Sequence, residues 1–220
     1  MAAFALALAL TGCTSEPDES AGGPAMYACA LVAEIRTGAA PESWDVQPGP
    51  DADPELVSAS AAISLLGAVS GAPLEGHDDL FSSAVTLGSG LADADTAVIH
   101  TGLDELDTTC DRSGLAWDDA DTSMAGRLDY ACGLVSAVRG DDSAVEDWIG
   151  AGATTNDREH LIANEAFGAA GLLGGTVAWQ LPDHEELSDA AQRLFTGLTR
   201  AEPESIEGAL TTIDDLCADR

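Results

Sequence analysis

The sequence predicts an all-α fold built from two tandem repeats, each an antiparallel four-helix bundle closed by a disulfide. Three observations support this prediction. Apolar residues recur at helical spacing, the two halves of the chain share matching segments, and four cysteines occupy matching places in those segments. The chain has 220 residues, of which 45% are hydrophobic, so it can bury packed cores.

Two pairs of matching segments indicate an internal duplication. The decapeptide Tyr27–Arg36 shares Tyr, Ala, Cys, Leu, Val and Arg with Tyr130–Arg139. The block His77–Cys110 aligns without a gap with His184–Cys217. We therefore predict a first repeat over residues 25–111, a linker over 112–126 and a second repeat over 127–220.

The two decapeptides predict the first helix of each repeat. Each ends in an arginine, Arg36 or Arg139, where a cation complements the helix dipole or holds a buried carboxylate. The second helices are expected near Pro54–Gly71 and Asp157–Gly175. Their small residues would allow close helix contact, namely Gly67, Gly71, Gly168 and Gly171.

The third and fourth helices show the clearest amphipathic spacing. In the second repeat, one face of the third helix carries Leu187, Ala191, Leu194, Phe195 and Leu198. The fourth helix places Ile206, Leu210, Ile213 and Cys217 on one face, matched in the first repeat by Ile99, Leu103, Leu106 and Cys110. Asp183 can cap the third helix, and Pro203 can occupy the first turn of the fourth.

Four cysteines lie at the ends of the predicted bundles. Cys29 and Cys132 begin the first helices, whereas Cys110 and Cys217 end the fourth. In an up-down-up-down bundle these two ends share a pole, which favours the pairs Cys29–Cys110 and Cys132–Cys217. The alternative pairs the repeats with each other, Cys29 with Cys132 and Cys110 with Cys217.

The N-terminal segment carries a fifth cysteine after a short apolar run. About ten apolar residues precede Leu10-Thr11-Gly12-Cys13, too few to span a bilayer but typical of a secretory signal. The motif resembles the lipobox of bacterial lipoproteins. The resemblance implies a signal peptide over residues 1–12, acylation of Cys13, and a lipid anchor on the extracytoplasmic face of the cell membrane. The polar segment 13–24 is expected to be a flexible tether.

The charge of the chain restricts its partners. Its 39 acidic residues outnumber its 8 basic ones, all of which are arginine, giving a formal net charge of −31. Such a surface repels phosphate, so the sequence argues against nucleic-acid binding. The expected partners are the membrane, through the lipid, and an unidentified protein or small-molecule ligand.

Two histidines and two tryptophans recur in both repeats and are candidate ligand-binding residues. His77 and His184 each precede two acidic residues, so they could bind a ligand or simply begin a helix. Trp44 and Trp148 follow the first helices, where an indole can line a pocket or close the end of a bundle.

Catalytic and metal signatures are weak. The sequence contains no HExxH, GxSxG, P-loop or GxGxxG motif, and no cofactor is expected. The leading hypothesis is a binding protein without catalysis. One alternative is a metal-binding, ferritin-like bundle for storage or redox chemistry that uses His160 and Glu165. Another is a structural protein of the cell envelope.

Overall fold

The protein is helical throughout the part of the chain that can be described. The computed structural model describes residues 22–45, 53–67, 77–115, 117, 120–150, 158–174 and 185–218, and these contain no strand. The predicted all-α fold class is confirmed. The helices are α1 (Gly22–Thr37), η1 (Pro41–Ser43), α2 (Pro54–Gly67), α3 (His77–Asp93), α4 (Thr96–Ser113), α5 (Met124–Gly140), α6 (Val145–Gly150), α7 (Arg158–Leu172), α9 (Glu185–Arg200) and α10 (Pro203–Ala218).

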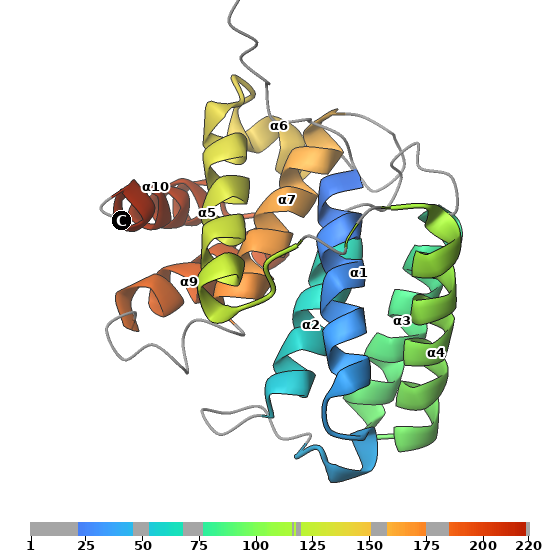
Figure 1. The fold of residues 1–220 in the computed structure, drawn as a ribbon. Coiled ribbons are helices and arrows are strands. Elements are labelled where there is room, and N and C mark those ends of the chain that lie inside the picture. The colour runs from blue at the N-terminus through green and yellow to red at the C-terminus, as the bar shows by residue number, and fades with distance from the viewer. Residues whose placement is uncertain are drawn as a thin grey trace, which may run out of the picture.

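The long helices form two groups (Figure 1). In the first group, α1 contacts α2 and α4, and α3 packs against the same two helices. In the second group, α5 contacts α7 and α10, and α9 packs against the same two. Each group therefore closes on itself, with its last long helix against its first. Helix α2 also packs against α7, which joins the groups.

One disulfide closes each group. Cys29 of α1 is bonded to Cys110 of α4, with 5.6 Å between their Cα atoms. Cys132 of α5 is bonded to Cys217 of α10, with 5.8 Å between their Cα atoms. These are the two pairs that the predicted bundle topology favours, and neither bond crosses between the groups.

Several helix ends follow from local sequence signals. Asp95 caps α4 by accepting hydrogen bonds from the backbone N–H groups of Ala97 and Val98, and Ser123 caps α5 in the same way through Gly126. Helix α10 begins at Pro203, as predicted. The expected cap Asp183 lies outside the described residues.

The predicted boundaries shift by a few residues. Helix α1 already begins at Gly22, inside the segment 13–24 that the sequence suggested as a tether. Helix α4 continues to Ser113 and α5 begins at Met124, so the connection between the groups is shorter than the predicted linker over 112–126. Both differences arise because helix ends carry few apolar residues and so give little periodic signal.

Two short helices were not predicted. Each follows the first long helix of its group: η1 contacts α4, and α6 contacts α7 and α10. Segments of three to six residues are too short to show helical periodicity. A hydrogen bond of 2.7 Å between Glu42 Oε1 and His100 Nε2 joins η1 to α4. Hydrogen bonds from the backbone and from His100 lower the pKa of Glu42.

The core contains the apolar faces that the periodicity predicts, with one exception. Leu187, Leu194 and Leu198 of α9 are buried, but Phe195 is 49% exposed and lies edge-on to Phe167 of α7. Its position at the edge of the face explains why the spacing alone misplaced it.

Small residues of α7 allow the close approach of α2. A methyl group added at Gly168 would lie 2.9 Å from Leu65, and one added at Gly171 would lie 2.5 Å from Ser64. Gly67 has no neighbour at this distance, so its expected role in helix contact is not seen. Gly71 lies outside the described residues.

Candidate functional site

A polar groove runs between α3 and α4 of the first group. The two helices are closest near their shared turn, where a methyl group added at Gly102 would lie 2.6 Å from the Leu87 backbone. The groove lies toward the other end of this helical hairpin and has a volume of about 530 Å³. Its lining consists of Asp79, Ser82, Ser83, Thr101, Asp104, Glu105, Thr108, Thr109 and Arg112.

Two buried hydroxyl groups form the floor of the groove. Ser83 is 5% exposed and Thr109 is 4% exposed. Ser83 donates a hydrogen bond to the Asp79 carbonyl at 2.9 Å, and Thr109 accepts one from Arg112 Nη2 at 3.2 Å. Among the described contacts, the Thr109 hydroxyl hydrogen has no acceptor, so this group is available to a ligand.

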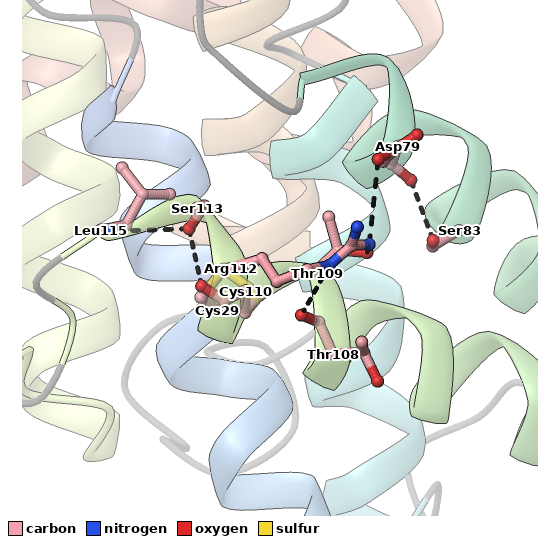
Figure 2. Close-up of a disulfide and its surroundings, with 9 residues drawn as sticks. All are labelled: Cys29, Asp79, Ser83, Thr108, Thr109, Cys110, Arg112, Ser113 and Leu115. Atoms are coloured by element: carbon pink, nitrogen blue, oxygen red, sulfur yellow. Dashed lines mark hydrogen bonds and ion pairs between the residues drawn. A yellow bond between two sulfur atoms is a disulfide. The ribbon is translucent and has the colours of Figure 1, made fainter.

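Arg112 spans the groove from one helix to the other (Figure 2). Its Nη2 atom lies 3.8 Å from Asp79 Oδ2 on α3, while its Nε atom donates to the Thr108 carbonyl on α4. Both charged side chains are well exposed, so this ion pair is a weak contact that a ligand could replace.

The rim of the groove is acidic. Asp104 forms an ion pair of 2.6 Å with Arg36 of α1, which also lies 3.7 Å from Asp107. Of the two roles considered for Arg36, holding a buried carboxylate is not seen, because both of its partners are exposed. Carboxylates, hydroxyls and one guanidinium are groups that bind polar ligands through hydrogen bonds and charge.

The described residues of the second group do not repeat the polar floor of this groove. In the gapless alignment of the two halves, Ser83 corresponds to Ala190 and Thr109 to Leu216. Ala190 is buried, and Leu216 packs against the hydrophobic core. The polar floor is therefore a property of the first group. The signal that could have revealed it is the presence of hydroxyl residues at positions that are apolar in the aligned second half of the chain.

Trp44 is part of the core. Its side chain is buried, and its indole Nε1 donates a hydrogen bond of 2.9 Å to the Ala39 carbonyl beside η1. The indole therefore closes one end of the first group, which is the second of the two roles considered for it.

The other predicted ligand-binding residues are placed only in part. His77 is the first residue of α3 and Trp148 lies in α6, but the side chains of both lie outside the described residues, as does the whole of His184. Cys13 is outside them as well.

The alternative prediction of a metal-binding bundle finds no support among the described residues. No three His, Cys, Asp or Glu side chains of that part of the chain lie close enough together to hold a metal ion. His160 lies on α7 with its side chain outside the described residues. Glu165 lies near Tyr130. Burial chiefly raises the pKa of the Tyr130 phenol, and the Glu165 charge raises it further.

Sequence reasoning missed an ion pair between the groups, in which the arginine is buried and the glutamate is half-exposed. The Arg127 side chain is 5% exposed, and its Nη2 atom lies 2.6 Å from Glu34 Oε2 of α1. The partners are far apart in the sequence, so spacing could not reveal the contact. The available signal was that Arg127 aligns with Pro24, and not with an arginine, when the decapeptides of the two halves are matched.

No known family model matches the chain, and neither a characterised protein nor a solved structure shows significant similarity to it. No helix in the described part of the chain is long and apolar enough to cross a membrane.

Proposed function

We propose that the protein is a lipid-anchored extracytoplasmic binding protein without catalytic activity, built from two tandem helical bundles. Its ligand site is the polar groove between α3 and α4. The observation that carries the proposal is that every cysteine beyond the Leu10–Cys13 motif is joined in a disulfide. Structural disulfides are typical of proteins that fold outside the reducing cytosol.

The tandem repeat is supported by the turns of the two helical hairpins. In the α3–α4 turn, the Asp95 N–H donates to the Gly90 carbonyl at 2.9 Å, and in the α9–α10 turn the Glu202 N–H donates to the Gly197 carbonyl at the same distance. The contacts among the long helices also follow the same order in both groups. Duplication of one four-helix unit accounts for both similarities.

The binding role is supported by the buried hydroxyls of the groove. A hydroxyl group in a helix interface costs stability unless it is fully hydrogen-bonded. The second group avoids this cost with Ala190 and Leu216. Ser83 already donates to the Asp79 carbonyl, whereas the Thr109 hydroxyl hydrogen has no acceptor among the described contacts, and a ligand in the groove would supply one.

Substitution of the lipid-bearing residue tests the anchor. The wild-type protein is expected to incorporate labelled fatty acid and to sediment with membranes when expressed in bacteria. Cys13→Ser is expected to remove both properties while leaving the helical content unchanged by circular dichroism. Labelling of the Cys13→Ser variant would contradict the proposal.

Replacement of the two floor residues by their counterparts in the second group tests the site. The variant Ser83→Ala/Thr109→Leu fills the floor of the groove with the side chains found in the other repeat. In a thermal-shift screen with amines, sugars and short peptides, at least one compound (a hit) is expected to raise the melting temperature of the wild-type protein but not that of this variant. Thr199→Leu, at an exposed position of α9, is the matched control and should keep the hit. A hit retained in the double variant would exclude the groove as the site.

A further inference from the structure

Equivalent residues of the two groups meet where the groups join. Tyr27 and Tyr130 occupy the same position of the duplicated decapeptide, and their rings stack with centroids 4.0 Å apart and planes 2° from parallel. Helices α2 and α7, the second long helices of the two groups, also pack against each other. Contact between like elements is the mark of an isologous interface, as in a two-fold dimer.

An interface of this kind is self-complementary. A surface that stacks tyrosine on tyrosine can accept a second copy of itself as readily as its duplicate. The contacts between like elements therefore do not explain why the first group should bind the second group rather than the first group of another molecule. The chain that joins the groups favours the second group of the same molecule through its effective concentration. Selection that is independent of this connection requires a contact that differs between the repeats.

The ion pair between Glu34 and Arg127 is such a contact. Arg127 also donates from Nε to the Thr122 carbonyl at 2.7 Å, which holds the buried guanidinium in place. In the register that pairs Tyr27 with Tyr130, Glu34 corresponds to Ala137 and Arg127 to Pro24. The ion pair is therefore formed once across the interface, whereas a symmetric contact would be formed twice.

The three possible pairings differ in how they treat these charges. Two first groups would place each Glu34 opposite Pro24, without a cation. Two second groups would bury two Arg127 side chains opposite Ala137, without a carboxylate. Arg127 is the buried member of the ion pair, so a pair of second groups would leave a buried charge without a partner, which is strongly unfavourable. The half-exposed Glu34 would lose its ion pair in a pair of first groups, at a smaller cost. Only the first group with the second group satisfies both charges.

We propose that the Glu34–Arg127 ion pair determines the partner of this interface, so that the first group binds the second group in preference to another copy of either. The inference rests on the tandem repeat proposed above. In this view the charged contact selects the partner, whereas the tyrosine stack and the packing of α2 on α7 hold the two groups together.

The full-length chain can test this after a single cleavage. A protease site introduced at residues 118–119, between the groups, would allow the folded protein to be cut. Both disulfides lie within a group, so no covalent bond would join the two products. Incubation in mild denaturant then lets the groups exchange, and native mass spectrometry counts mixed pairs and pairs of one kind.

The wild-type protein is expected to give mixed pairs almost exclusively. Glu34→Arg places two cations together and is expected to reduce the ratio of mixed pairs to pairs of first groups by about 10-fold or more. Because Glu34 is half-exposed, the substitution should not disturb folding. The reversed pair Glu34→Arg/Arg127→Glu is expected to recover the mixed pairs. Arg36→Met is the matched control, because the carboxylates that pair with Arg36, those of Asp104 and Asp107, belong to the same group as Arg36.

Each other outcome counts against the inference. A wild-type mixture with only about half mixed pairs, the statistical proportion, would show that the charges do not select partners. Failure of the reversed pair to improve on Glu34→Arg would show the same. Loss of helical structure after cleavage would overturn the tandem repeat as well, whereas folded groups that ignore charge reversal would overturn this inference alone.

Discussion

Ala94 and Ala201 adopt the same left-handed backbone conformation, with φ of 51° and 52°, in the turns that join α3 to α4 and α9 to α10. Each donates its N–H to the carbonyl three residues earlier, Leu91 or Leu198, at 3.3 Å. The Cβ atom makes this conformation unfavourable for alanine, whereas glycine adopts it freely. Two strained alanines at matching positions have a direct consequence for stability.

Glycine at either of these turns should stabilise the protein. We expect Ala94→Gly and Ala201→Gly each to raise the free energy of unfolding by about 0.5–1 kcal/mol, because relief of the left-handed strain exceeds the entropic cost of glycine. Urea unfolding measures the change. Ala137→Gly, at an exposed position in the last turn of α5, is the control and should lower stability by up to about 1 kcal/mol. Equal losses at all three positions would contradict the prediction.

Close packing in the first hairpin predicts a large effect of one methyl group. Gly102→Ala would place the new Cβ against the Leu87 backbone, so we expect it to cost about 1–3 kcal/mol of stability. A methyl group added at the exposed Gly208 of α10 would have no atom within 4 Å. Gly208→Ala should therefore stabilise the protein by about 0.5–1 kcal/mol. Thermal unfolding followed by circular dichroism compares the two, and a neutral Gly102→Ala would show that the helices separate easily.

Removal of either disulfide should destabilise the group that it closes. The bonds join residues 81 and 85 positions apart, and the chain-entropy model assigns about 4 kcal/mol to each. We expect each double variant to lower the free energy of unfolding, measured in guanidinium, by this amount. The variants are Cys29→Ser/Cys110→Ser and Cys132→Ser/Cys217→Ser. Addition of reductant to wild type should reproduce both losses, and a double variant that unfolds like wild type would refute the expectation.

The stacked tyrosines should make the protein sensitive to alkali. Burial chiefly raises the pKa of both Tyr27 and Tyr130 above that of an ordinary tyrosine, near 10. Their contribution to stability is therefore complete below about pH 10, the pKa in the unfolded state. Above it the folded state keeps its phenolic protons while the unfolded state loses them, so stability falls by up to about 1.4 kcal/mol per pH unit for each tyrosine.

Ultraviolet titration can follow this directly, because these are the only two tyrosines in the chain. Phenolate absorbance is expected to appear above pH 10 together with loss of helical circular dichroism, and at lower pH when the protein is unfolded in guanidinium. Tyr27→Phe should halve the absorbance change and remove the hydrogen bond of 2.8 Å to the Asp121 carbonyl. Titration of native tyrosines near pH 10 without unfolding would contradict burial as the cause.

The sequence predicted those features that depend on local spacing or on repetition. The alignment of the halves indicated which cysteines are bonded, and proline at position 203 marked the start of α10. The apolar faces of α4 and α10 followed from helical periodicity, because a helix buries one side of its surface.

The features that the sequence did not reveal depend on tertiary contacts. Thr109 occupies a core position by its spacing, so its place in a polar groove became clear only from the approach of α3. Arg127 resembles an ordinary surface residue until the packing of α1 beside α5 brings Glu34 to it. Helix Gly22–Thr37 began earlier than expected because glycine and proline carry no amphipathic signal.

The covalent topology also determines how the molecule responds to mechanical force. Each sulfur bridge joins the middle of the first long helix of a group to the end of its last helix. Tension applied at the chain termini therefore passes through the S–S bonds and does not act on residues 30–109 and 133–216. In a single-molecule pulling experiment, only the segments outside these loops can lengthen until the bridges are reduced. A reductant should then release the stored contour length in two separate steps.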